Sequence, residues 1–181
     1  MKKFFTLLMT LVALFAFSVG ASAAPASKNN LSSDKAKELA LVARQIHWDV
    51  MSGGTLKPDP KCDTQSFEYK GTDYRYLCGE LSTKKSFTKY LNQSFTLNSI
   101  NKAIKKYGFI EHKGKMAQPN ADGGSILDWK ASKAKLIYSR KDVRQFEFTV
   151  PVGETKTTEK KKVTFVKVNN KWQINDFDAV R

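Results

Sequence analysis

The residues that could carry out nucleophilic chemistry are few and far apart in this chain of 181 residues. Cys62 and Cys78 are the only cysteines, and His47 and His112 are the only histidines. A Cys–His pair could provide a nucleophile and its base, but a lone histidine inside an expected helix, such as His47, is more often packed or solvated. Two histidines also leave no His-rich metal site, so we expect neither a metal nor a cofactor.

The carboxylates and serines of the chain also form no recognisable catalytic pattern. Asp122 and Asp128 are separated by glycines, and this spacing sets no geometry for glycoside hydrolysis. The Ser-x-x-Lys pattern of penicillin-binding enzymes recurs by chance in a chain rich in Ser and Lys, and no Lys-Thr-Gly accompanies it. Neither Gly-x-Ser-x-Gly nor a phosphate-binding glycine loop is present. The sequence therefore predicts a protein that is not an enzyme.

The stretch best suited to recognition is the segment 116–129, Met-Ala-Gln-Pro-Asn-Ala-Asp-Gly-Gly-Ser-Ile-Leu-Asp-Trp. It carries two carboxylates and no Lys or Arg, in a chain whose net charge is +14. A long loop inside a compact domain often has a function, although a solvated connection between two strands explains the pattern equally well. Its turn-forming residues are Pro119, Asn120, Asp122, Gly123, Gly124 and Ser125.

The first 23 residues have the three parts of a secretory signal peptide. Lys2 and Lys3 provide a positive start, residues 4–19 are almost entirely apolar, and an Ala-x-Ala pattern ends at Ala23. A retained membrane anchor is the alternative, but the apolar run is shorter than the roughly 20 residues that a spanning helix needs. We expect a secreted, extracellular protein with no transmembrane segment.

Cleavage after Ala23 leaves 158 residues with 29 basic and 17 acidic side chains, a net charge of +12. That length suits a single domain. An exported protein seldom meets nucleic acid, and no recognition motif for it is present, so we expect no nucleic-acid partner. Anionic wall polymers are the abundant extracellular partners, which favours a salt-sensitive association with the cell wall. A charge that serves solubility alone is the other interpretation.

An even pair of cysteines in an exported chain is typical of a disulfide. A Cys62–Cys78 bridge would close a loop of a size that stabilises the fold by ~3 kcal/mol in the chain-entropy model. The hairpin predicted between these two residues would bring them near each other. The competing interpretation is that one of them is a Cys–His nucleophile.

After a flexible tail at 24–30, Ser33 is the predicted cap of a helix that ends at Gly53-Gly54. Two basic helices are expected at 82–95 and from Thr96 or Asn98 to Tyr107. The expected buried stripe of the first helix comprises Leu39, Val42, Ala43, Ile46 and Val50.

Between the first and second helices, residues 66–70 and 73–77 predict a hairpin around Gly71-Thr72. Phe67, Tyr69, Tyr74 and Tyr76 are interpreted as sheet packing rather than a binding platform. Beyond Gly108 the pattern predicts strands at 109–112, 134–139, 143–152, 163–168 and 171–174, a charged turn at 153–162 and a tail at 176–181.

The predicted fold is therefore α+β. Residues 31–181 form a single domain in which about three helices pack with a curved antiparallel sheet, made of the hairpin and a C-terminal meander.

Five stretches carry a resemblance to a known family. They are the leader ending in Ala-Ser-Ala-Ala, the helix start Ser33-Asp34-Lys35-Ala36-Lys37-Glu38-Leu39-Ala40, the hairpin Phe67-Glu68-Tyr69-Lys70-Gly71-Thr72-Asp73-Tyr74, the loop Gln118-Pro119-Asn120-Ala121-Asp122-Gly123-Gly124-Ser125 and the ending Asn169-Asn170-Lys171-Trp172-Gln173-Ile174. Over essentially its full length the chain resembles the IseA family of secreted D,L-endopeptidase inhibitors. The resemblance implies a wall-associated α+β domain that restrains NlpC-type cysteine peptidases of peptidoglycan stem peptides, and with them cell separation and autolysis.

The resemblance turns the loop into a functional hypothesis. Residues 119–125 would form an inhibitory loop that enters the catalytic cleft of the peptidase. Asp122 would mimic a carboxylate of the anionic stem peptide, while Gly123 and Gly124 would let the backbone lie close to the catalytic cysteine. The alternative is a wall-polymer binding module that shields peptidoglycan through its basic helix faces and the run Lys160-Lys161-Lys162, without contacting an enzyme. In either case we expect a monomer.

Overall fold

The computed structural model describes residues 30–54, 66–121 and 123–181. Residues Leu31–Arg181 form one compact unit. It contains three α-helices and two antiparallel sheets of four strands each, so the predicted α+β class is confirmed. The predicted signal peptide lies outside the described residues, as does all but the last residue of the predicted tail. Within the described part of the chain, no helix is long and apolar enough to cross a membrane.

Capping side chains fix where the helices begin. The Ser32 hydroxyl accepts a hydrogen bond from the backbone N–H three residues further on (3.2 Å), so Ser32 rather than the predicted Ser33 caps the first helix. Thr96, one of the two predicted caps, begins the third helix in the same way. The second is shorter than the predicted 82–95 at both ends, because Thr83 caps its start and Asn92 caps its end. The helices are α1 (Ser33–Met51), α2 (Lys84–Leu91) and α3 (Leu97–Lys106), with short 3-10 helices η1 (Gly79–Leu81) and η2 (Phe177–Val180).

The first sheet, sheet A, joins the predicted hairpin to two strands that follow α3. Its strand order is β1-β2-β4-β3, and every neighbouring pair is antiparallel. The hairpin is present, but its two-residue turn is Lys70-Gly71, both with positive φ, rather than Gly71-Thr72. The strands are β1 (Ser66–Tyr69), β2 (Thr72–Tyr76), β3 (Ile110–His112) and β4 (Lys115–Pro119).

Strand β4 corrects the sequence analysis, which places its residues in a loop. Met116, Ala117 and Gln118 are buried in the middle of sheet A. The turn Lys113-Gly114 joins β3 to β4, and both of its residues have positive φ. Lys-Gly is a weaker turn signal than Asn-Gly, and β4 is buried without an alternating apolar pattern. For these two reasons the sequence pattern does not predict this strand.

The second sheet, sheet B, is a meander in which each strand pairs with the next. The predicted turn at 153–162 is shorter than expected because β7 begins at Thr158, so Lys160, Lys161 and Lys162 lie in the strand. An ion pair between Lys160 and Glu147 of the neighbouring strand (3.0 Å) helps a charged strand to pair there. The predicted Asn169-Asn170 turn is confirmed. The strands are β5 (Lys133–Arg140), β6 (Val143–Pro151), β7 (Thr158–Val168) and β8 (Lys171–Ile174).

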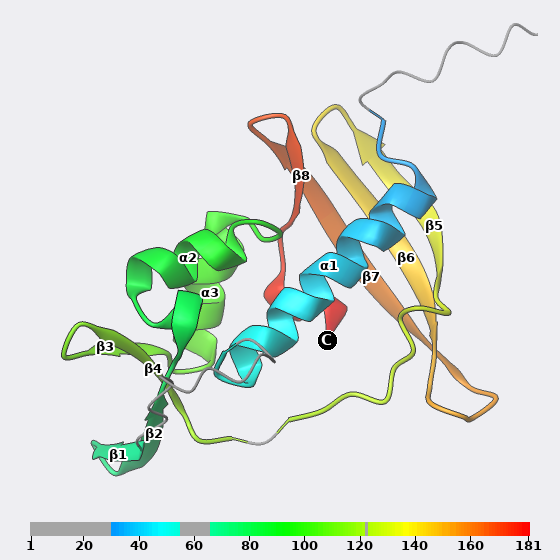
Figure 1. The fold of residues 1–181 in the computed structure, drawn as a ribbon. Helices are drawn as coiled ribbons and strands as arrows, with labels where there is room; N and C mark the ends of the chain where they lie inside the picture. Colours follow the sequence, from blue (N-terminus) through cyan, green and yellow to red (C-terminus); the bar gives the residue numbers. More distant parts are fainter. Residues whose placement is uncertain (1–29, 55–65, 122) are drawn as a thin grey trace, which may run out of the picture. The chain divides into compact units, whose positions relative to one another are not determined.

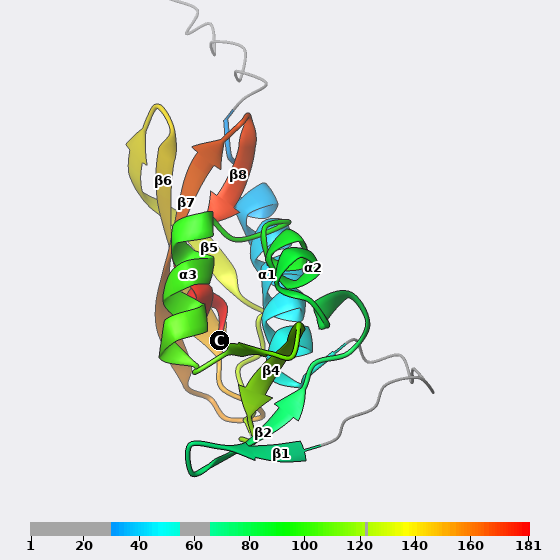
Figure 2. The same cartoon turned by 90° about the vertical axis from the view of Figure 1, so that its left-hand side faces the viewer.

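Helix α1 lies across one face of sheet B (Figures 1 and 2). Ala36, Ala40 and Ala43 are fully buried, and such small side chains let the helix backbone approach its neighbours closely. Val42, which the sequence analysis places in the buried stripe, is 49% exposed because the helix turns its alanines inward instead. The largest fully buried side chains of the core are Trp129, Phe87, Phe95, Phe146, Phe148 and Phe165.

The C-terminal residues 176–181, predicted as a tail, instead complete the core. Phe177 and Val180 are buried, and they lie in η2. The Asp176 carboxylate begins this short helix by accepting a hydrogen bond from the Asp178 backbone N–H (3.0 Å). A segment with one turn of helix is too short for its periodicity to reveal a buried face.

Candidate functional site

The candidate site is built on residues 120–132, named the link here, which join β4 of sheet A to β5 of sheet B (Figure 1). Of the residues predicted for an inhibitory loop, Pro119 is the last residue of β4 and pairs with Tyr74. Asp122 lies outside the described residues. The remaining candidates lie in the first half of the link: Asn120, Ala121, Gly123, Gly124 and Ser125.

At its first residue the link is held by the β1–β2 hairpin. The Asn120 backbone N–H donates to the Asp73 carbonyl (2.8 Å), and its side-chain amide donates to the Ser66 hydroxyl (3.4 Å). Just before it, the Pro119 ring packs so closely on Gly108 that a Cβ there would come within 3.2 Å. The chain therefore leaves sheet A in a fixed direction.

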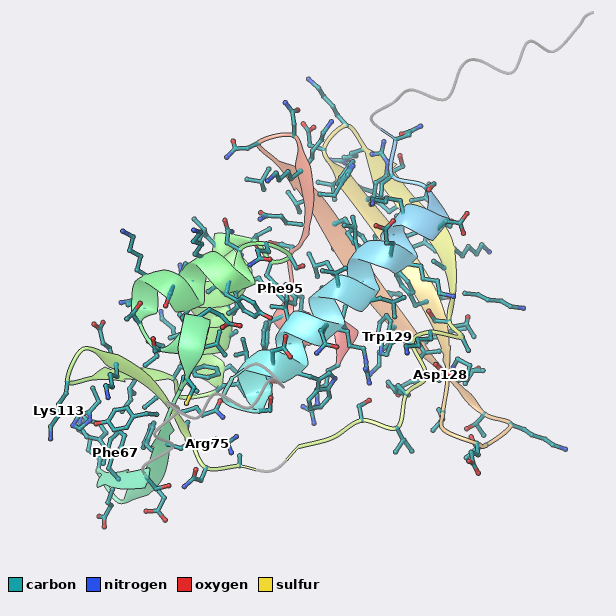
Figure 3. The ribbon with its side chains drawn as sticks, viewed as in Figure 1. Phe67, Arg75, Phe95, Lys113, Asp128 and Trp129 are labelled. Atoms are coloured by element: carbon teal, nitrogen blue, oxygen red, sulfur yellow. The ribbon has the colours of Figure 1, made fainter. Side chains whose placement is uncertain are left out.

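The second half of the link is held by sheet B. The Ile126 carbonyl accepts a hydrogen bond from the Gly153 N–H (2.7 Å), and the Asp128 N–H donates to the Pro151 carbonyl (2.8 Å). Leu127 forms an isolated antiparallel bridge with Val152 between these two bonds. Figure 3 shows Asp128 at this end of the link and Arg75 near the other end. The candidate loop is thus held at one end by the β1–β2 hairpin and at the other by the end of β6 and the turn that follows it.

Between these anchors, the described part of the loop faces solvent. Ala121, Gly123 and Gly124 are exposed. Neither glycine has a positive φ. A Cβ at Gly123 would meet only Trp48, at an ordinary 3.8 Å, and a Cβ at Gly124 would meet nothing within 4 Å. The free protein therefore places no requirement for glycine at either position.

Behind the loop, the C-terminal end of α1 is joined to sheet A through one carbonyl. The Met51 carbonyl accepts hydrogen bonds from the Arg75 guanidinium (3.1 Å) and the Gln118 side-chain amide (3.2 Å). These two side chains lie opposite each other on β2 and β4. A cation and an amide donor at a helix C-terminus satisfy its last carbonyls and complement its dipole. Together with Trp48, Ser52, Ala121 and Gly123, Met51 and Arg75 line a cavity of about 210 Å³.

The sequence analysis does not identify Arg75 or Gln118. Their roles depend on β4 being a strand and on its register with β2, and neither is visible in the local pattern. Nothing in the local sequence around Arg75 or Gln118 indicates that both side chains donate to the same carbonyl.

Of the two carboxylates considered from the sequence, Asp122 lies outside the described residues. Asp128 has a structural contact of its own. Its carboxylate accepts a hydrogen bond from the Ala131 N–H (3.1 Å), which closes the turn that precedes β5. Aspartate side chains in loops commonly accept hydrogen bonds from nearby backbone N–H groups.

The two histidines lie in separate parts of the fold. The His47 ring is buried in the core and its Nδ1 donates to the Phe177 carbonyl (3.1 Å). The His112 ring stacks on Phe67, with the ring centroids 4.3 Å apart, and its Nδ1 lies 2.7 Å from the Tyr76 hydroxyl oxygen. Phe67 and His112 come from the two edge strands of sheet A, so their contact requires a strongly curled sheet. This arrangement is sheet packing, as expected for the hairpin aromatics.

Cys78 follows β2 and is disulfide-bonded, which removes it as a nucleophile. Its predicted partner, Cys62, lies outside the described residues, so the Cys62–Cys78 bridge stays a prediction. Within the described residues, no group of three or more His, Cys, Asp or Glu side chains could hold a metal ion.

Comparison with known proteins decides the family. A family model described as IseA DL-endopeptidase inhibitor matches residues 27–179. The chain belongs to this family. A protein of Bacillus subtilis (strain 168), described as uncharacterized protein YoeB, is 42% identical to it over 181 residues, and the match covers 99% of each chain.

Membership in the IseA DL-endopeptidase inhibitor family fixes the coarse function. The family consists of inhibitors rather than enzymes, and its name implies a DL-endopeptidase as the partner. The matched residues include both sheets and the whole link. The resemblance seen in the sequence is therefore confirmed.

The buried histidine makes a testable contribution to stability. Burial lowers the pKa of His47 from its usual 6.5 to about 4, against the opposing effects of the Phe177 carbonyl and the Asp178 carboxylate, with smaller lowering effects from Arg181 and Arg44. Between these two pH values the unfolded chain gains a proton that the folded chain does not. The free energy of unfolding should thus fall as the pH falls from 6.5 to 4, by about 3 kcal/mol at most.

Urea unfolding of the protein and of His47→Gln at several pH values measures this effect. The variant should be less stable at pH 7, and the difference between the two proteins should shrink toward pH 4. A difference that stays constant across this range would contradict the assignment.

Proposed function

We propose that the protein is exported, stays at the cell wall, and restrains NlpC-type D,L-endopeptidases by inserting the loop 120–125 into their catalytic cleft. Residues 1–23 would act as the signal peptide that carries it there. The observation that supports this mechanism is the construction of the link. An exposed glycine-containing segment is held at Asn120 by sheet A and at Ile126–Asp128 by sheet B.

Anchoring at both ends favours tight binding. A segment that is fixed on both sides loses less conformational freedom when it enters a cleft than a free tail would lose. The hydrogen bonds of Asn120 and Ile126 fix the backbone on both sides of this segment. The Arg75–Met51–Gln118 contact holds the helix end behind this segment, so the two anchors keep their separation.

The chemistry of the loop suits the cleft of an enzyme that cuts anionic peptides. Stem peptides carry free carboxylates, so a cleft that binds them should offer positive charge. Asp122 would present a carboxylate there, in a stretch without Lys or Arg. Charge complementarity of this kind contributes to specificity and to the rate of association. Because both neighbouring glycines lack a side chain, the backbone could lie directly against the catalytic cysteine.

Reversing the charge of the loop should abolish most of the inhibition. Losing a buried interfacial charge pair costs roughly 2–5 kcal/mol, so Asp122→Lys should raise the inhibition constant tens- to thousands-fold. The measurement is cleavage of a soluble stem peptide by a purified NlpC-type endopeptidase with increasing inhibitor. Glu154→Lys, in the exposed β6–β7 turn, changes the net charge equally and serves as the control. Equal inhibition by Asp122→Lys and the parent would refute the role of Asp122.

The glycines allow backbone approach to be tested separately from charge. In the free protein, Gly123→Ala and Gly124→Ala meet no obstacle, so their thermal unfolding should match that of the parent. If the backbone lies against the catalytic cysteine, an added methyl group should weaken inhibition about tenfold or more, because overpacking a close contact costs about 1–3 kcal/mol. Full inhibition by both variants would show that the enzyme leaves room at these positions.

A second candidate function, the binding of anionic wall polymers, is favoured by one specific observation. Lys133, Lys135, Lys160 and Lys162 share the face of sheet B that is turned away from the buried phenylalanines, around a single Glu147. All four lysines are exposed. The run at 160–162 is divided, because Lys161 points to the other face and pairs with Glu159 (2.6 Å). We name the four residues the lysine face. It could retain the protein at the wall whether or not an enzyme is bound.

Removing charge from the lysine face should weaken wall binding. At about 1 kcal/mol for each lysine near an anionic surface, replacing Lys133, Lys135 and Lys162 by Gln should lower the affinity roughly 100-fold at low salt. Co-sedimentation with purified walls at several salt concentrations measures this. A variant with Lys102, Lys105 and Lys106 of α3 changed to Gln controls for net charge. Equal losses in both variants would show that the charge acts without a defined surface.

Cleavage of a soluble substrate distinguishes the two candidate functions. Direct inhibition should persist with a small stem peptide, where no wall polymer is present. Shielding of peptidoglycan should require the polymer and disappear with the peptide.

A further inference from the structure

Ile126 is the most exposed large apolar side chain among the described residues, with 72% of its surface accessible. It directly follows the candidate loop. Single exposed apolar side chains are common on protein surfaces, so exposure alone decides nothing. The backbone and the surroundings of Ile126 are more informative.

The backbone of Ile126 is fixed although its side chain is free. Its carbonyl accepts the Gly153 N–H (2.7 Å), and the bridge between Leu127 and Val152 follows immediately. On the other side, the Ser125 hydroxyl accepts a hydrogen bond from the Leu127 N–H (3.3 Å). A side chain presented from a fixed backbone loses little freedom when a partner covers it.

Ile126 also borders an open groove of about 730 Å³ that continues the loop surface. Three of its four charged side chains form ion pairs within the protein: Lys161 pairs with Glu159 (2.6 Å), and Asp178 pairs with Lys106. The fourth, Arg181, is exposed. Because most of its charges are paired, the groove favours an apolar occupant over an ion. The lining residues are Gly124, Ser125, Leu127 and Val152 beside Ile126, with Glu159, Lys161, Asp178 and Arg181 on the polar side.

We propose that Ile126 is an apolar anchor that packs against an apolar patch of the endopeptidase catalytic domain, beside the cleft that receives the loop. This inference rests on the proposed function, because it takes the enzyme to be at the loop. Gly124 and Ile126 are two residues apart, which is at most about 7 Å along the chain. An enzyme that contacts Gly124 therefore reaches the groove. An apolar anchor beside a polar rim is the usual composition of an interface hot spot.

The test compares Ile126→Ser with a matched control. Leu97→Ser removes another exposed apolar side chain, 56% accessible, at the start of α3 and away from the link. Burying a side chain of this size contributes enough that Ile126→Ser should weaken inhibition of a purified NlpC-type endopeptidase about 10- to 100-fold on a soluble stem peptide. Leu97→Ser should inhibit as the parent does. Both variants should unfold at the temperature of the parent, because both side chains face solvent.

The outcomes distinguish this inference from the function on which it rests. If the parent does not inhibit at all, the proposed function fails. If the parent inhibits and Asp122→Lys is impaired while Ile126→Ser inhibits like the parent, the loop mechanism stands and the anchor is overturned. Gel filtration tests whether a second copy of this chain, rather than an enzyme, covers Ile126. A parent that self-associates, together with a monomeric Ile126→Ser variant of full inhibitory strength, would assign Ile126 to contact between copies of this chain and overturn the proposal.

Discussion

The hydrogen bonds that meet at the Met51 carbonyl connect the two halves of the fold. Arg75 of β2 and Gln118 of β4 donate to the last turn of α1, whose other end packs across sheet B. Among the described residues, sheet A contributes few fully buried apolar side chains to the core, whereas sheet B and α1 contribute many. The helix end is thus one of the points at which sheet A is held.

The properties of the loop follow from that position. A segment that runs from one sheet to another must cover the distance between them, so it cannot close into a tight turn. Its ends are held by backbone hydrogen bonds, through Asn120 on one side and Ile126 on the other. The described residues of its middle, Ala121, Gly123 and Gly124, are exposed. A rigid scaffold that presents an exposed loop is a frequent basis for binding. Here the scaffold is the junction of two sheets.

Features defined by neighbouring residues could be predicted from the sequence. The Asn169-Asn170 turn, the Thr96 cap and the three helices depend on residues within a few positions of each other. The exposed glycine segment at 123–124 was also recognisable, because turn formers mark it directly. The α+β class follows from the same local signals.

Features that depend on distant residues could not be predicted. Strand β4 is stabilised by partners on both sides, so its own pattern carries little information. The contact between Phe67 and His112 needs the curl of sheet A, and the burial of Phe177 needs the position of α1. Arg75 and Gln118 can share an acceptor because the register of β2 with β4 places them opposite each other. The site was thus predictable as a loop, but its supports were not.

The two proposed surfaces lie on opposite faces of sheet B, and the alternation of β7 shows why. Lys161 borders the groove beside Ile126, while its neighbours Lys160 and Lys162 belong to the lysine face. One strand therefore contributes to both surfaces without either covering the other. A polymer on the lysine face would leave the loop and the groove open to an enzyme. Retention at the wall would then raise the local concentration of inhibitor around enzymes that bind the same polymer, which strengthens inhibition without any new contact.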